Sequence, residues 1–204
     1  RIGYISGKLL QDHVVKAEIL LHGSFATTGI GHGTDKALIA GLLGMRPDDI
    51  RIPDSFFLAK RDGMEFSFST ITLKDAHPNT AVLRLTGEHG RKIEVQAASI
   101  GGGRILIAKL DGIEVNFSAE KPTLIVHNVD QPGHVAQVTS MLAEKQVNIA
   151  TLQLYRDKRG GYAVMVLECD SHIPHVLEQQ MAVMPGIRKV TCLNIDEPEE
   201  CEEG

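Results

Sequence analysis

The sequence predicts an α+β fold in two parts: a mixed, largely antiparallel sheet, then a smaller module of order β-α-β-β-α-β. Three observations support this prediction. In the first part, helical and strand-like patterns are mixed, and hairpin signals join the later strands. In the second part, strands and helices follow one another in a regular order. Glycine use also changes along the chain, because fifteen of the twenty glycines precede Lys121.

The first part opens with a helical pattern, in which apolar residues recur from Ile2 to Leu10. Because this pattern is already present at Arg1, we expect further residues upstream. An apolar run at 17–21 predicts a buried strand, and a second helical pattern follows at 36–43. The later strand-like runs lie at 81–85, 92–97 and 104–110, with hairpin signals at 87–90 and 111–112.

A polar segment at 116–122, which ends in Pro122, predicts a linker between the two parts. The elements expected after it are strands at 124–129, 147–155, 162–169 and 187–195, and helices after the turn 130–133 and at 173–184. This order is the ferredoxin-like unit, in which both helices cover one face of a four-stranded sheet. We therefore expect domains at 1–115 and 123–195, and a disordered acidic tail at 196–204.

Charge and cysteine content exclude several classes of protein. The net charge is −5, but six acidic residues lie within 196–203, so the remainder carries only about +1. That balance favours neither nucleic acid nor a membrane surface as a partner. No apolar run is long enough to span a membrane, and no signal peptide is visible. The three cysteines, Cys169, Cys192 and Cys201, are widely spaced without a CxxC motif, which indicates a reducing, cytoplasmic location and no metal site.

Three segments rich in glycine and polar residues are the candidate functional loops. They cover 23–35, 75–80 and 98–103, and each adjoins a predicted strand. The first precedes a predicted helix, where backbone N–H groups suit a small anion such as a carboxylate. The triple glycine at 101–103 indicates either a backbone that approaches a ligand or a bulge at a sheet edge. We expect the three loops to converge on one site.

Individual residues in these loops allow two interpretations each. His32 is either a proton carrier or donor to a substrate carboxylate, or a histidine bonded within its own loop. Asp35 and Thr34 either serve the site or cap the following helix. Pro78 and Asn79 fit a turn before a strand as well as a substrate contact. The spacings of His32, Asp35, Asp75 and His77 are not those of a metal site.

Residues 123–195 resemble an ACT domain, a small ligand-sensing module, through Asp130-x-Pro132-Gly133 and Asn148-Ile149. The resemblance implies an amino-acid effector held between this turn and the facing strand of a second copy, hence a dimer through these domains. The strand at 147–155 has apolar residues on both parities, which suits a strand covered on both faces or one continued across an interface. The effector-binding residues it implies are Asp130, Gly133, His134, Asn148 and Ile149; His134 could instead be bonded within its own segment.

Residues 1–115 are similar to the beta chain of iron–sulfur-dependent L-serine dehydratase, a domain of the allosteric substrate-binding type. The matching motifs are Gly23-Ser24-Phe25-Ala26, Gly31-His32-Gly33-Thr34-Asp35, Asp75-x-His77-Pro78-Asn79-Thr80 and Ser99-Ile100-Gly101-Gly102-Gly103. The resemblance implies elimination of water from L-serine to give pyruvate and ammonia, with His32 as the catalytic residue. The substrate-binding residues it implies are Ser24, Thr27, Gly31, Gly33, Thr34, Asp35, Asp75, His77, Asn79, Ser99 and Gly101.

The same family carries a [4Fe–4S] cluster on a separate alpha chain, so the resemblance implies that partner and a subunit that is inactive alone. The cysteines here agree, because Cys169 and Cys192 lie on separate predicted strands and cannot converge on a cluster. One departure concerns Pro-Ser-Ser-Ser-His-Thr, which the family carries just before the first helix and this sequence lacks. The alternative function is a non-catalytic amino-acid sensor resembling the C-terminal half of D-3-phosphoglycerate dehydrogenase, and the upstream sequence would discriminate between them.

Overall fold

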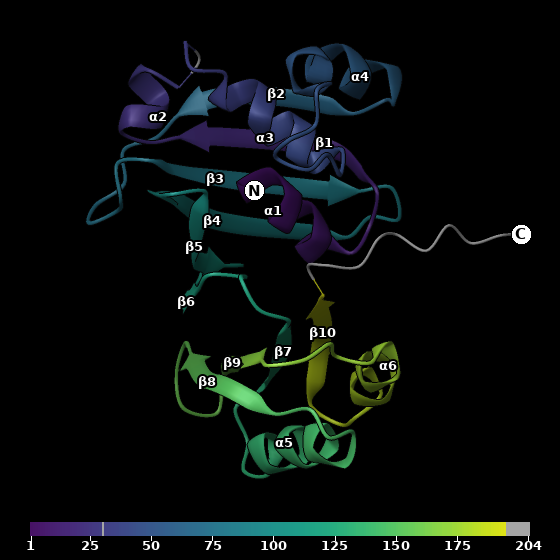
Figure 1. Ribbon diagram of the computed structural model, residues 1–204. Coiled ribbons are helices and arrows are strands. Elements are labelled where there is room, and N and C mark those ends of the chain that lie inside the picture. The colour runs from purple at the N-terminus through teal and green to yellow at the C-terminus, as the bar shows by residue number, and fades with distance from the viewer. Residues whose placement is uncertain (30, 195–204) are drawn as a thin grey trace, which may run out of the picture. The chain divides into compact units, whose positions relative to one another are not determined.

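A computed structural model describes residues 1–29 and 31–194 (Figure 1). The chain forms two compact units, Arg1–Ser118 and Ala119–Gly204. The expected acidic tail at 196–204, with Cys201, lies outside the described residues. Within those residues, no helix is long and apolar enough to cross a membrane.

A six-stranded sheet forms the first unit, in the order β2-β1-β3-β4-β5-β6. Its strands are β1 (Val14–Leu21), β2 (Glu65–Thr70), β3 (Thr80–Gly87), β4 (Lys92–Gly101), β5 (Arg104–Leu110) and β6 (Ile113–Phe117). β1 and β2 are parallel and every other neighbouring pair is antiparallel, so the predicted mixed sheet is confirmed.

The helices of the first unit are α1 (Ile2–Leu10), α2 (Ser24–Thr27), α3 (Thr34–Leu42), the 3₁₀ helix η1 (Ile52–Asp54) and α4 (Ser55–Arg61). Glycines let α1 and α3 cross closely. A Cβ atom on Gly3 would lie 2.1 Å from the Leu38 carbonyl oxygen, and one on Gly41 would lie 2.4 Å from the Tyr4 nitrogen. This crossing places the start of α1 beside the middle and end of α3.

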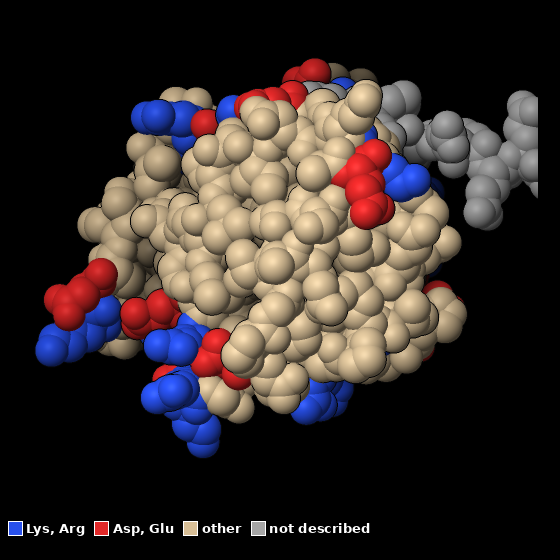
Figure 2. All heavy atoms as spheres, turned by 90° about the horizontal axis from the view of Figure 1, so that it is seen from below, with Lys and Arg blue, Asp and Glu red and all other residues tan. Residues whose placement is uncertain are grey.

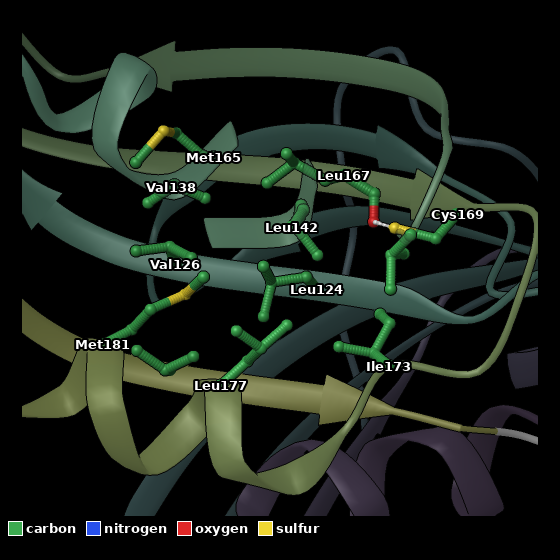
Figure 3. Close-up of a cluster of buried hydrophobic side chains, with 12 residues drawn as sticks. Leu124, Val126, Val138, Leu142, Met165, Leu167, Cys169, Ile173, Leu177 and Met181 are labelled. Carbon is green, nitrogen blue, oxygen red and sulfur yellow. Dashed lines mark hydrogen bonds between the residues drawn. The ribbon is translucent and has the colours of Figure 1, made fainter. Parts of the chain in front are cut away.

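The second unit has the predicted ferredoxin-like order, with strands in the sequence β10-β7-β9-β8. Its elements are β7 (Thr123–Val129), α5 (His134–Glu144), β8 (Ile149–Arg156), β9 (Tyr162–Cys169), α6 (His175–Ala182) and β10 (Ile187–Leu193). Both helices cover one face of the sheet, where Val138 and Leu142 of α5 meet Leu177 and Met181 of α6 over the strands (Figure 3).

The outer surface over α5 carries few charges, and a broad uncharged area is visible from below (Figure 2). Neither α5 nor α6 contains a lysine or an arginine. Val135, Val176 and Val183 are exposed on these helices and at the end of α6.

Two expectations about the first unit need correction. The linker does not begin at 116, because Asn116 and Phe117 complete β6, and Phe117 is only 2% exposed. The alternation of buried Ile113, Val115 and Phe117 explains why the strand continues. In addition, no helix or strand was expected at 44–74, where the structure has η1, α4 and β2.

Candidate functional site

The three candidate loops meet at one end of the sheet in the first unit. β1 and β4 end where the antiparallel β3 begins, and backbone hydrogen bonds join the segments beyond them. Ser24 N–H donates to the Pro78 carbonyl at 2.8 Å, and Ser99 N–H donates to the Asn79 carbonyl at 2.9 Å. Gly23 allows the first contact, because a Cβ atom there would lie 2.4 Å from the Pro78 oxygen.

The glycines of the first loop have separate roles. Gly29 is buried, and a Cβ atom on it would lie 2.3 Å from the Phe25 carbonyl oxygen. Thr34 N–H donates to the Gly29 carbonyl at 2.8 Å, which closes the loop. Gly33 precedes α3 with a φ of 73°, a left-handed conformation that favours glycine. Gly31 has neither constraint, since a Cβ atom there would make only an ordinary contact, 3.5 Å from the Thr28 oxygen.

A cavity of about 330 Å³ opens beside this loop. The cavity volume lies at the lower end of the usual range for small-ligand sites. It is lined by Arg1, Ile2, Gly3, Phe25, His32, Gly33, Thr34, Ala37, Leu38, Pro47, Ser99, Gly103 and Ile105. The first turn of α3 lies on its wall, and helix N-termini favour anions.

Four of the predicted site residues line this cavity: His32, Gly33, Thr34 and Ser99. His32 is exposed, and its backbone N–H donates to the Thr28 carbonyl at 3.2 Å. The Asp35 carboxylate accepts the Lys36 N–H at 2.8 Å, so it serves the first turn of α3. The arrangement combines an imidazole, hydroxyl groups and a helix N-terminus around a space large enough for an amino acid.

The other predicted substrate residues do not line the cavity. They are Ser24, Thr27, Gly31, Asp35, Asp75, His77, Asn79 and Gly101. Several have local partners: the Thr27 hydroxyl donates to the Gly23 carbonyl at 3.4 Å, and His77 Nδ1 accepts the Asn79 N–H at 3.1 Å. Gly101 has a φ of 90°, and a Cβ atom there would meet nothing within 4 Å. Their contacts with a substrate remain predictions.

Nine lining residues were not predicted as site residues: Arg1, Ile2, Gly3, Phe25, Ala37, Leu38, Pro47, Gly103 and Ile105. Phe25 and Gly103 belong to motifs that the sequence analysis recognised, so their position could have been inferred. Arg1 and Pro47 reach the cavity only through the tertiary fold. The Arg1 guanidinium donates to the Gly103 carbonyl at 3.2 Å, which ties the start of α1 to the β4–β5 turn.

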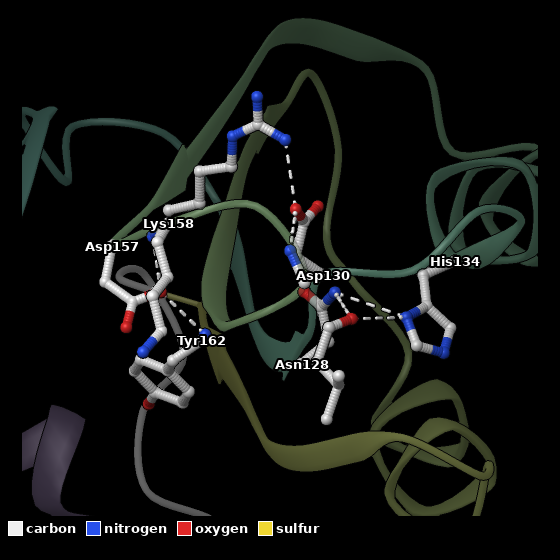
Figure 4. Close-up of polar contacts among 9 residues, drawn as sticks. Asn128, Asp130, His134, Asp157, Lys158 and Tyr162 are labelled. Atoms are coloured by element: carbon white, nitrogen blue, oxygen red, sulfur yellow. Dashed lines mark hydrogen bonds and ion pairs between the residues drawn. The ribbon is translucent and has the colours of Figure 1, made fainter.

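In the second unit, the predicted effector turn lies between β7 and α5 (Figure 4). Asp130 Oδ2 accepts hydrogen bonds from Gly160 N–H at 2.9 Å and from the Arg156 guanidinium at 3.0 Å. The Gly160 N–H and then Arg156 lower the pKa of Asp130 below its ordinary value. This carboxylate is therefore ionised and held against the β8–β9 hairpin of its own unit.

His134 and Asn128 form a buried polar pair behind the turn (Figure 4). The two ring nitrogens of His134 lie 2.9 Å from the Val129 oxygen and 3.0 Å from the Pro185 oxygen. The interpretation of His134 as a residue bonded within its own segment fits this geometry. Asn128 Oδ1 is buried and has no hydrogen-bond partner among the described residues.

The two halves of the predicted effector site lie at opposite ends of the sheet. Asn148 donates to Asp170 Oδ2 at 2.6 Å, and Ile149 pairs with Cys169, whereas Val129 pairs with Tyr162. Seven steps along β9 separate these positions, about 23 Å at the usual rise of a strand. One copy of the chain therefore does not bring Asp130 and Asn148 together.

The described residues do not suit an iron–sulfur cluster. Among positions 1–29 and 31–194, no three His, Cys, Asp or Glu side chains are grouped as a metal site. β7 separates Cys169 on β9 from Cys192 on β10. Burial raises the pKa of Cys169 to about 11 and also raises that of Cys192, so both free thiols stay protonated at neutral pH.

Comparison with known protein families gives two matches along the chain. Residues 4–63 match the family described as serine dehydratase beta chain, and residues 122–183 match the ACT domain. The matched segments include the glycine loop and the β7–α5 turn, the two sites described above.

Similar proteins extend the match over most of the chain. The L-serine dehydratase beta chain of Peptoniphilus asaccharolyticus is 35% identical over 94% of this chain and 85% of its own length. The probable L-serine dehydratase beta chain of Bacillus subtilis is 34% identical over 94% of this chain and 86% of its own. The D-3-phosphoglycerate dehydrogenase of Methanocaldococcus jannaschii is 26% identical over 95% of this chain but only 36% of its own length.

Proposed function

The chain belongs to the family of L-serine dehydratase beta chains, and from this membership we propose that it is the beta subunit of a cytoplasmic enzyme that converts L-serine to pyruvate and ammonia. An alpha chain completes the enzyme, and this chain alone is inactive. The cavity at the start of α3 is the observation that carries the proposal, because it gathers His32, Thr34 and Ser99 at a helix N-terminus.

Each part of the cavity has a task in this proposal. The α3 N-terminus and the Arg1 side chain attract the substrate carboxylate, since both present positive potential to the space. Thr34 and Ser99 orient the bound amino acid. His32 moves a proton to or from it, because an imidazole changes charge near neutral pH.

The [4Fe–4S] cluster of the proposed enzyme resides on the alpha chain. When bound there, it supplies the Lewis acid that a poor leaving group such as hydroxide needs. The protonated thiols of Cys169 and Cys192 do not fit as its ligands, so no step of the reaction is assigned to them. This chain contributes substrate binding and proton transfer.

Anaerobic co-expression tests the proposal. The alpha chain alone, this chain alone and the two together are purified and assayed for pyruvate formation from L-serine. We expect turnover only when both chains are present. Equal turnover by the alpha chain alone, or none from a complex that carries its full cluster, would refute the proposal.

A second function, amino-acid sensing, is supported by the ACT-domain match at residues 122–183. Residues about 23 Å apart in one copy can share a ligand only if a second copy supplies one of them. We propose that the ACT domains pair and bind an amino acid between them, so that the ligand stabilises the pair. Sedimentation of the full chain at rising concentrations, with and without single amino acids, tests this. A sedimentation coefficient that no amino acid shifts would contradict it.

A further inference from the structure

The two edges of the six-stranded sheet differ in how they are protected. The β6 edge carries the charged Glu114, which pairs with Lys109, and its pairing with β5 contains a register shift. The β2 edge pairs with β1 over six residues without a shift, and Phe66–Thr70 contains no charge and no proline. Charges and bulges are the usual devices that prevent edge pairing. β2 has neither over most of its length.

An aromatic cluster lies beside this unprotected edge. Phe66 and Phe68 are half-buried on the same side of β2, opposite Ala17 and Ile19 of β1. The Phe56 ring of α4 lies with its centroid 5.0 Å from that of Phe66 and 6.0 Å from that of Phe68. The next residue on α4, Phe57, is 67% exposed. α4 therefore accompanies β2 at the edge and leaves a large aromatic side chain in solvent.

Charges around α4 are arranged with opposite signs at its two ends. Asp54 precedes the helix, and Lys60 and Arg61 end it; all three are exposed. A twofold axis through the β2 edge would make two α4 helices antiparallel. Each acidic end would then face the basic end of the other copy, and both Phe57 side chains would approach the axis.

We propose that β2 of one copy pairs with β2 of a second copy, antiparallel about a twofold axis, to join two sheets into one. A C2 contact of this kind uses the same surface twice, so it needs a self-complementary edge. If Ser67 is the central residue, Phe66 faces the partner's Phe68 and Glu65 faces the partner's Ser69. If Phe68 is central, Ser67 faces the partner's Ser69. In neither register do like charges meet.

Hydrogen exchange of the full chain, measured at a series of protein concentrations, tests the β2–β2 contact directly. Half of the β2 amides point away from β1, and pairing would bury them in hydrogen bonds. We expect exchange at 65–70 to slow at least tenfold as the chain associates, while exchange at the β6 edge stays constant. Exchange at 65–70 that is independent of concentration across the association would overturn the proposal.

Substituted variants provide a second test of the β2–β2 contact. The double substitution Ser67→Glu and Ser69→Glu places like charges opposite each other in both registers, because each new carboxylate faces Glu65 or another new carboxylate. We expect it to weaken association at this edge at least tenfold. Asn116→Glu, which adds a charge to the β6 edge, is the matched control. Phe57→Glu, on α4 rather than in the sheet, repeats the test without altering β2. Slow exchange at 65–70 that persists at high concentration in both variants would refute the pairing. Protection of 65–70 that appears only on addition of the alpha chain would assign the edge to that subunit and overturn pairing with a second copy.

Discussion

The cavity of the first unit and the effector turn of the second unit were both predicted from loops at helix N-termini, but they are built differently. The cavity gathers residues from α1, α3 and β4, and His32 on its wall is exposed. At the turn, Asp130 and His134 are bonded to their own unit, and Asn148 lies at the far end of the sheet. The residues of the cavity come together within one copy, whereas the proposed effector site would need a second copy.

This difference predicts where each substitution will act. A polar residue that lines an open cavity contributes little to packing, so its loss should appear in catalysis. A polar residue bonded into its own framework contributes to stability, so its loss should appear in unfolding. The predictions below test this division, from the largest expected effect to the smallest.

His32→Ala should lower kcat of the assembled enzyme by a factor of about 10²–10⁴, the usual cost of losing a general acid or base. Its thermal unfolding should match that of the original chain, because the side chain is exposed. His172→Ala, at an exposed position outside the cavity, is the control. Unchanged kcat and KM in His32→Ala would make this residue structural and remove it from the site.

His127 of β7 should act on stability through pH. It is 2% exposed, and burial, followed by the charge of Lys189, lowers its pKa to about 4 from 6.5. Between these values the unfolded chain binds more protons than the folded one, so stability falls as the pH drops from about 6.5 to 4. The full loss is about 3 kcal/mol. Urea unfolding at a series of pH values measures it, and His127→Gln should remove that part of the slope. An unchanged slope in His127→Gln would contradict the assignment.

Gly29→Ala and Gly31→Ala form a matched pair in the glycine loop. The first places a Cβ atom 2.3 Å from the Phe25 oxygen, and we expect a loss of about 1–3 kcal/mol in unfolding free energy. The second meets only an ordinary contact, so stability should change by less than about 0.5 kcal/mol. Chemical denaturation measures both. Equal losses of unfolding free energy in the two variants would show that the close approach of Gly29 to Phe25 does not hold the loop.

Asp130→Asn should have the smallest effect. Without added amino acids, kcat and KM for L-serine should stay within about twofold, since the residue lies outside the cavity. The Arg156 side chain is mostly exposed, so its ion pair with Asp130 contributes little to stability. Apart from a small loss of stability, the change should appear in the response to an effector amino acid. A large loss of basal activity would show that the turn takes part in the reaction.

The sequence predicted some levels of this structure better than others. The order of elements in the second unit followed from clear periodicity and turn residues such as Pro132 and Gly133. The η1–α4–β2 segment was missed because its elements are short and their aromatic side chains pack only in the tertiary structure. For the cavity, local motifs identified His32, Gly33, Thr34 and Ser99. Pro47 could not be found that way, since its place depends on how distant segments fold together.

The proposed effector site shows a feature that local sequence motifs did not predict, namely the distance between its two halves. Sequence motifs placed Asp130 and Asn148 in one proposed site, but strand order decides their distance, and β9 separates them along its whole length. No local pattern contains that information. The triple glycine at 101–103 was likewise ambiguous. Its three left-handed residues complete β4 and its turn, and a Cβ atom on any of them would meet nothing within 4 Å.

A ¹H–¹⁵N titration of the full chain with L-serine tests the central claim most directly, because one spectrum reports on both regions. If the cavity of the first unit binds the substrate carboxylate, the amides of Gly33, Thr34 and Asp35 at the start of α3, together with Ser99 and Gly103, should shift on addition of L-serine. L-Serinamide, which lacks the carboxylate, should leave them in place. Shifts confined to 130–134, or equal shifts with both compounds, would contradict the account.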